Sequence, residues 1–530
     1  MNKKLLALAL CAAPLMMNAQ AAFDALKLSQ SELRGTSRSM SMAGAYTAVG
    51  GDLSSINQNP GGIGVYRNSD VGLTMSLDFN SSKSDDGTKY NKTHFMLNNV
   101  AYVGVLRTNN DILKNFNWGI SFNRNNSFNR RYYGNMTRFN SSMSNYIAGL
   151  TNSGNWTKKD IVFTDKYNPY WDGGAPWMSV LAYDTYIINA NDAGDAFFGL
   201  MDNGTTGFGE YEVEEKGHTD EYSLTLGGNV SDMLYWGLGF GLTDMKYDSY
   251  VYYGEGLNNA FVAQATDDAT ITTGNATYGL TNYLETRGTG YNFKMGFILK
   301  PVKEFRIGAA FHTPTFYKLT DTYATVASTR IEPNGKTAFE TNQRAGDDWN
   351  KYDYRITTPW KFNLGLAGVI GTSGIISVDY EYTGFRTMRV KDYRGNEFYD
   401  TTRDIENYFK AAHKVSVGGE VKINNHVSLR AGYSYQTSPV NKDIEDNVQE
   451  VTTVSTNPSY FYDKTTQHIT AGLGYRYKAF YADLAYVHQY RKGNFHSFSP
   501  VQYADGFEPG NVAEIDTHNN RVSLTLGVRF

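Results

Sequence analysis

The sequence predicts an all-β protein: a 14-stranded antiparallel transmembrane β-barrel with an N-terminal hatch, or plug, on the periplasmic side. Three observations predict it: apolar residues at every second position, alternately short and long connections, and a chain that is aromatic-rich yet hydrophilic. The 530 residues include 40 Tyr, 29 Phe and 7 Trp, with a mean hydropathy of −0.46. Because no run of about 20 apolar residues follows the N-terminus, helical membrane spans are excluded.

Residues 1–21 form a predicted signal peptide. Lys3 and Lys4 precede an apolar stretch, and Ala19-Gln20-Ala21 has the small-x-small pattern of a cleavage site. Cleavage after Ala21 removes Cys11, the only cysteine, so no disulfide is expected to hold the exported chain. The formal charge of −4 argues against a nucleic-acid partner, which would favour a basic face.

Strict alternation identifies the barrel strands. Between Val71 and Phe79, apolar residues alternate with Gly72, Thr74, Ser76 and Asp78, as expected when one face meets lipid. The same period marks 116–122, 234–242, 291–299, 305–311, 362–370, 376–382, 415–423, 427–435, 469–477, 482–490 and 522–530. Weaker candidates at 92–107 and 220–228 bring the count to fourteen. Such a barrel must close, since lipid cannot satisfy an open sheet edge.

The connections predict the orientation of the barrel, residues 69–530. Short connections at 300–304, 371–374, 424–425 and 477–480 alternate with long segments at about 129–219, 248–287, 314–359, 386–412, 437–465 and 491–520. Outer-membrane barrels have short periplasmic turns and long extracellular loops. We therefore expect a multi-pass protein of a Gram-negative type of cell outer membrane, in contact with its lipids and lipopolysaccharide. The longest extracellular loop is 129–219.

Residues 22–68 lack the strand period and are rich in Gly, Ser and Asn, which favour tight turns. We interpret them as the hatch. The small-residue-rich segment 38–50, followed by Asp52 and Asn59-Pro60-Gly61, resembles the hatch of the FadL/TodX-type long-chain fatty-acid and hydrocarbon transporters. That family usually has Asn-Pro-Ala, so Gly61 departs from the pattern. Asn57, Asn59, Pro60 and Gly61 are the matched hatch positions.

Other stretches resemble the barrel strands of the same family, in order and over nearly the whole mature chain: 290–296, 306–312, 358–367 and 429–435. The resemblance implies a fourteen-stranded barrel and passive uptake of a hydrophobic small molecule across the outer membrane. Loops would capture the ligand, an apolar pocket above the hatch would hold it, and a gap in the barrel wall would release it. We expect a monomer.

Charged residues in the inward phase suggest two interpretations. These residues are Lys294, Arg306, Asp379, Glu381, Glu420, Lys422, Arg430, Arg476, Asp483 and Arg529. One interpretation is a network of ion pairs that holds strands and hatch together, with Glu32, Arg34, Arg38 and Asp52 as hatch partners. The sharper one is that Arg306 or Arg430, with Lys294 as a further candidate, anchors a ligand carboxylate, because guanidinium binds carboxylates bidentately.

Two other functions stay open: a general porin, and a surface receptor or adhesin, for haem as one example, acting through the aromatic-rich segment 129–219. An enzyme is not expected. The chain has no G-x-S-x-G, Walker loop, C-x-x-C or H-E-x-x-H motif. His426 and Ser428 share one face of a predicted strand, but next to a short turn. We therefore predict no catalytic residue, no cofactor and no metal site.

Overall fold

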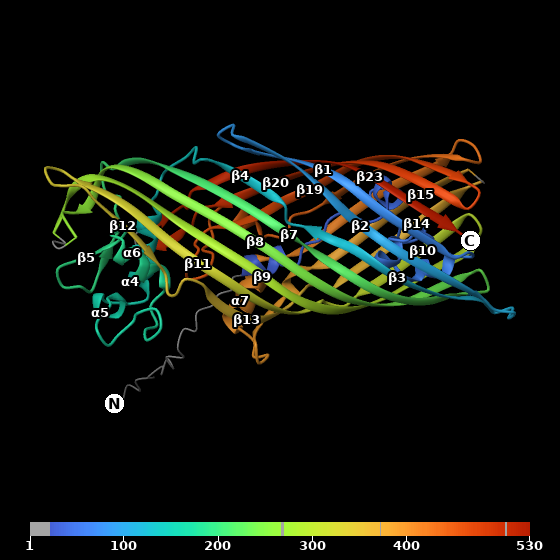
Figure 1. The fold of residues 1–530 in the computed structure, drawn as a ribbon, viewed down its shortest axis with the longest axis horizontal. Helices are drawn as coiled ribbons and strands as arrows, with labels where there is room; N and C mark the ends of the chain where they lie inside the picture. Colours follow the sequence, from blue (N-terminus) through green and yellow to red (C-terminus); the bar gives the residue numbers. More distant parts are fainter. Residues whose placement is uncertain (1–21, 267–269, 372, 504–505) are drawn as a thin grey trace, which may run out of the picture.

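The computed structural model describes residues 22–266, 270–371, 373–503 and 506–530, and the predicted signal peptide lies outside this part. Fourteen antiparallel strands close the barrel (Figure 1): β1 (Asp70–Ser84), β2 (Lys89–Arg107), β3 (Leu113–Ser127), β7 (Thr206–Val230), β8 (Leu234–Ala263), β9 (Ile271–Val302), β10 (Phe305–His312), β14 (Lys361–Ile370), β15 (Gly374–Gly384), β17 (Ala411–Lys422), β18 (Val427–Gln436), β19 (Tyr460–Tyr477), β20 (Phe480–His496) and β23 (Val512–Arg529). β23 pairs with β1 to complete the ring. The fourteen predicted strands are confirmed.

An apolar band surrounds the barrel on its outside. In β8, Leu238, Phe240 and Leu242 are exposed, while the glycines between them face the lumen. One end of the barrel has only short connections, and we call it the short-turn end; the opposite end is the long-loop end. Exposed tyrosines mark both limits of the band, as girdle residues do: Tyr433 lies toward the long-loop end and Tyr475 toward the short-turn end.

Several segments predicted as long loops are strands. Much of 248–287 and 314–359 continues the barrel wall past the apolar band, and so this part of the prediction is wrong. The added strands are β4 (Arg130–Asn135), β11 (Phe316–Pro333), β12 (Phe339–Arg344), β13 (Asn350–Thr357) and β16 (Arg389–Asp392). The turn between β1 and β2, at 85–88, is short although it lies at the long-loop end.

Helices lie at the long-loop end. α4 (Met143–Ser153), α5 (Lys158–Ile161) and α6 (Trp177–Asp184) are seen at the left of Figure 1. The other elements of the long connections are α7 (Tyr399–Tyr408), α8 (Lys442–Glu445), β5 (Asn189–Ala190), β6 (Phe197–Phe198), η2 (Phe385–Thr387), β21 (Val501–Tyr503) and β22 (Gly506–Glu508). α4, α5 and α6 share a large apolar core in which the Trp177 indole is fully buried, whereas α7 and α8 belong to a second core together with α1. No helix of the described ranges is both long and apolar enough to cross a membrane.

The N-terminal segment runs inside the barrel between its two ends. Its first helix, α1 (Ala22–Leu28), lies at the long-loop end, where Phe23 packs among the rings of Tyr408, Phe409 and Tyr460. The following elements, α2 (Ser37–Ser41), α3 (Ser55–Gln58) and η1 (Pro60–Val65), pack near the short turns. Residues 22–68 were all expected on the short-turn side. The apolar face of α1 instead draws it into the aromatic cluster formed by the loops.

The barrel wall is partly unpaired between β2 and β3. β2 and β3 pair only from Asn99 to Arg107, and β2 residues 89–98 pair with β1 alone. A bulge at Arg124/Asn126 bends β3, and the backbone N–H of Glu32 donates to the Asn125 carbonyl there, at 3.0 Å. The N-terminal segment therefore lies directly behind the level at which β2 and β3 separate.

Candidate functional site

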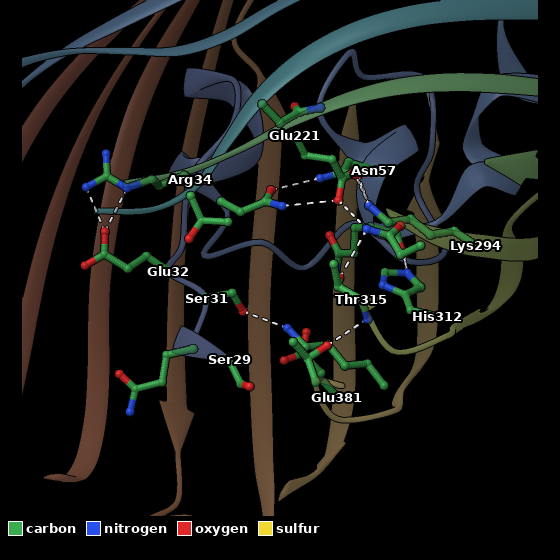
Figure 2. A pocket seen from close by; sticks show the side chains of 18 of the residues that line it. Ser29, Ser31, Glu32, Arg34, Asn57, Glu221, Lys294, His312, Thr315 and Glu381 are labelled. Atoms are coloured by element: carbon green, nitrogen blue, oxygen red, sulfur yellow. Dashed lines mark hydrogen bonds and ion pairs between the residues drawn. The ribbon is translucent and has the colours of Figure 1, made fainter. Parts of the chain in front are cut away.

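A cavity of about 200 Å³ lies in the lumen between the hatch and the segment that follows α1. Its lining comes from residues 28–35, from the hatch, and from β3, β9, β14, β15 and β17, and it includes Asn123 and Asn125 at the open seam. Figure 2 shows polar and charged side chains converging on this space. The apolar pocket that the family resemblance implied is thus a mainly polar cavity at this level.

Lys294, one of the three predicted carboxylate anchors, faces this cavity. Its ammonium group contacts Glu221 and the side-chain oxygen of Asn57, a predicted hatch residue (Figure 2). The His312 ring lies nearby and hydrogen-bonds the Gln58 carbonyl at 2.8 Å. Glu221 also accepts from the Asn292 amide at 3.0 Å, so the charge of Lys294 is neutralised within a well-bonded group.

Two further lysines of the cavity were not singled out from the sequence. Lys361 begins β14 and donates to the Ser31 hydroxyl at 2.9 Å, while Lys414 faces Glu381 across the β15–β17 ladder. Of the carboxylates that line the cavity, Glu32 pairs with Arg34 and Glu221 pairs with Lys294, which leaves Glu381 to balance these two ammonium groups. The strand period could have placed both lysines in the lumen. Each directly precedes an outward apolar residue, Phe362 or Val415, and therefore points inward.

The hatch motif makes main-chain contacts with the barrel wall. The Asn59 amide donates to the carbonyls of Thr47, at 2.6 Å, and Phe297, at 3.1 Å, and its side-chain oxygen accepts from the Gly61 N–H at 2.9 Å. Asn59 thereby caps η1 and joins it to β9. Such a cap satisfies N–H groups that the short helix leaves unpaired.

Arg430, the second predicted anchor, belongs to a buried ion-pair network between hatch and barrel. Arg38 of the hatch donates to Glu420 at 2.9 and 3.1 Å, and Arg430 donates to Glu420 at 2.5 Å and to Asp483 at 2.6 Å. This geometry is the predicted ion-pair network. Arg306, the third anchor candidate, donates to the Val49 carbonyl at 2.7 Å, on the side of the hatch facing the short turns.

A second network joins the hatch to the seam. The Arg34 guanidinium bonds Glu32, Asp78 and Asn98 at 2.7–3.0 Å and touches the Met96 sulfur, so it lies behind the unpaired part of β2. Glu32 and Arg34 thus pair with each other and with Asp78 and Arg521 of the wall, and not with the inward charges listed from the sequence. Asp52, the remaining predicted partner, instead accepts hydrogen bonds within the hatch, from Thr36 and Ser54.

A smaller cavity of about 60 Å³ lies at the long-loop end beside α1. Its lining is largely aromatic and aliphatic: Phe23, Tyr132, Tyr247, Val251, Leu284, Tyr460, Phe461 and Phe495. Lys27 of α1 lies at its edge and contacts Glu215, which Arg130 also holds at 2.9 Å. The aromatic residues Tyr132 and Tyr247 thus enclose apolar space next to a neutralised charge.

The docking of α1 is expected to depend on pH. Beyond the apolar band, burial raises the pKa of Asp321 to about 8, and the nearby Asp24 of α1 raises it as well. A carboxyl group with a raised folded-state pKa stabilises the fold below its unfolded pKa of about 4, and that contribution is lost as the pH rises through 8. Hydrogen exchange of the backbone amides of residues 22–28 should therefore be faster at pH 9 than at pH 5. The difference should exceed the pH dependence that exchange has in an unprotected amide.

Asp321→Asn should abolish that difference, because an amide cannot ionise. Asp353→Asn is the matched control, since Asp353 directly precedes the Tyr354 that bonds Asp321 but is exposed on the opposite face of the strand. If exchange in Asp321→Asn depends on pH as in the wild-type protein, then Asp321 does not control the docking of α1.

These features together define a class: a closed transmembrane barrel whose lumen is plugged by its own N-terminal segment. The chain belongs to the family described as outer membrane protein transport protein (OMPP1/FadL/TodX), which matches residues 217–490. It is thus a member of a family of outer membrane transport proteins.

A solved structure agrees with this fold. The chain is similar to a FadL homologue from Pseudomonas aeruginosa, with a TM-score of 0.54 and 13% identity over 94% of this chain and 99% of that one. The Pseudomonas putida toluene transporter TodX gives 0.49, 12%, 95% and 100%, and the Ralstonia pickettii toluene transporter TbuX gives 0.43, 13%, 94% and 99%. A comparison with curated proteins finds no match.

Proposed function

We propose that this protein is a monomeric channel for passive uptake of hydrophobic molecules across the outer membrane of a Gram-negative type of cell. The ligand class that the site favours is an acidic amphiphile, such as a long-chain fatty acid. The observation that carries the proposal is the lumenal cavity beside the β2–β3 seam, in which Glu381 is the lining carboxylate left to balance Lys361 and Lys414. An anionic head group would balance this surplus of positive charge.

Three features support a path through the molecule. The aromatic cavity beside α1 offers a first site for an apolar chain at the extracellular end. The cavity above the hatch then holds the head group, with Lys294, Lys361 and Lys414 around it. The unpaired seam between β2 and β3 lies next to Asn123 and Asn125 and would release the ligand sideways into the membrane.

The alternatives fit the site less well. A general porin needs an open lumen, whereas the hatch packs against the wall near the short turns. A pure hydrocarbon channel would leave the lysines of the cavity without a role. A surface receptor would act through the long-loop end and would not need an internal cavity next to a seam. Ion conductance in planar bilayers distinguishes the general porin from the proposed channel. A porin should conduct ions well, and the proposed channel should conduct them poorly.

The double variant Lys361→Gln/Lys414→Gln should bind oleate about tenfold more weakly, because a charge-assisted hydrogen bond contributes about 1.5–3 kcal/mol. Titration of the purified protein in a non-ionic detergent measures this. In a strain lacking its own long-chain fatty-acid transporter, the variant should also support slower growth on oleate. Lys318→Gln, which changes an exposed lysine of β11 outside the cavity, is the control.

Binding of a neutral hydrocarbon of equal length separates head-group recognition from chain recognition. The wild-type protein should bind it more weakly than oleate, and the double variant should bind both alike. Equal oleate affinity in the wild-type protein and the double variant would contradict the head-group assignment. Absence of any bound amphiphile and of any growth difference would contradict the uptake function itself.

A further inference from the structure

A second cavity, of about 330 Å³, lies on the opposite side of the hatch, where the short turns are. We infer that it is an anion site that takes a phosphate or phosphate-ester group. Six cationic side chains line it, against one carboxylate, that of Glu420: Arg38, Arg67, Arg306, Lys422, Arg476 and Arg529. This site is separate from the ligand cavity above the hatch and does not depend on the proposed uptake function.

Half of these cations are already neutralised. Arg38 binds Glu420, and Arg529 binds Asp70 at 2.8 Å, while Arg67 reaches Asp232 at the exposed rim, at 3.4 Å. Glu420 is also shared with Arg430, so its charge is fully used. These pairs hold the hatch to the wall and leave no carboxylate of the cavity lining for the other three cations.

The other three cations, Arg306, Lys422 and Arg476, have no carboxylate within 4 Å among the described residues. Arg306 donates to one backbone carbonyl, and its Nε is buried without a hydrogen-bond acceptor. A buried donor without an acceptor is costly, and like charges around one cavity repel. A bound anion would relieve the repulsion among these three cations.

The chemistry of the side chains favours phosphate. Arginine presents a planar fork of donors that matches phosphate oxygens bidentately, and two of the three unpaired cations are arginines. Three unpaired positive charges also suit a group that carries more than one negative charge. The cavity volume of about 330 Å³ leaves room for such a group together with water.

The position of the site adds a further argument. Lys422 and Arg529 are the last residues of β17 and β23, and Arg306 is the second residue of β10. The site therefore lies at the rim of the barrel, at the depth where lipid head groups meet water. Its phosphate could come from a lipid head group or from a free phosphate compound.

The test compares the wild-type protein with Arg306→Gln/Arg476→Gln, in which the neutralised pairs stay intact. In the first arm, the purified chain in a non-ionic detergent is titrated with sodium phosphate. In the second arm, nanodiscs containing phosphatidylglycerol and phosphatidylcholine are analysed by native mass spectrometry for retained lipid. We expect the double variant to bind phosphate, or retain phosphatidylglycerol, about tenfold less. Lys303→Gln, at the neighbouring turn and outside the cavity, should match the wild-type protein.

The two arms identify the source of the phosphate. Saturable phosphate binding indicates a free compound, whereas enrichment of phosphatidylglycerol alone indicates a lipid head group. If the double variant does not fold, Lys422→Gln replaces it, because the Lys422 side chain makes no ion pair among the described residues, and we expect a smaller loss in the same direction. The inference is overturned if the wild-type protein shows neither binding, or if Lys303→Gln weakens binding as much as the cavity variants.

Discussion

Glu420→Gln is expected to lower the free energy of unfolding by about 3–5 kcal/mol, because it leaves two buried arginines facing each other. Glu420 is the carboxylate that Arg38 of the hatch and Arg430 of β18 share, and its side chain is 5% exposed. Asp483 alone would then balance the two guanidinium groups. Denaturant unfolding in detergent measures the loss, and the hatch should become more accessible to protease from the short-turn side.

An exposed ion pair provides the control for the stability loss expected of Glu420→Gln. Asp400→Asn breaks an exposed pair with Arg403 on α7 and should change stability by less than about 1 kcal/mol. Adding Arg38→Met to Glu420→Gln should recover part of the loss, since an apolar side chain removes one uncompensated charge. A Glu420→Gln protein as stable as Asp400→Asn would show that the network does not hold the hatch.

Gly296→Ala should displace the hatch and raise ion conductance well above that of the wild-type channel. A Cβ at this position would lie 1.9 Å from the Asn59 side-chain oxygen, which is fixed by its hydrogen bond to Gly61. Overpacking costs about 1–3 kcal/mol, and the lost hydrogen bonds of Asn59 add to it. Conductance of single channels in planar bilayers is the measurement.

A second and a matched variant make this prediction specific. In Gly237→Ala the new Cβ would meet the Pro60 carbonyl at 2.1 Å, so this variant should behave like Gly296→Ala. In Gly368→Ala the nearest atom is a side-chain carbon at 3.5 Å, and conductance should stay at the wild-type level. Low conductance in all three variants would mean that the hatch adapts without opening the lumen.

Periodicity predicted the spanning strands well because lipid imposes the same demand on every strand. It failed beyond the membrane, and β8 shows why. Leu238, Phe240 and Leu242 point outward to lipid, whereas the apolar side chains farther along, Tyr253 and Leu257, point inward into the loop core. The alternation continues through β8, but its apolar phase reverses where water replaces lipid outside. A search for apolar residues in the outward phase alone therefore predicted a loop where β8 continues beyond the apolar band.

The site was predictable in part. The phase of the strands placed Lys294 and Glu420 in the lumen, and the polar hatch residues Arg34 and Arg38 were expected to pair with the wall. The cavity above the hatch could not be predicted, because it depends on where residues 28–35 cross the lumen after α1 has bound the loops. No periodic pattern encodes such a path, which follows from packing between distant parts of the chain.

The route of the N-terminal segment also constrains how the protein is assembled. Ser37 of the hatch hydrogen-bonds Ser523 and Thr525 of β23, at 2.9 and 2.7 Å, and β23 forms the final seam with β1. A segment that reaches from one rim to the other cannot be threaded into a finished cylinder easily. We therefore expect the hatch to be inside the barrel before β23 pairs with β1. The first and last parts of the chain to be synthesised would then meet in the final step of assembly.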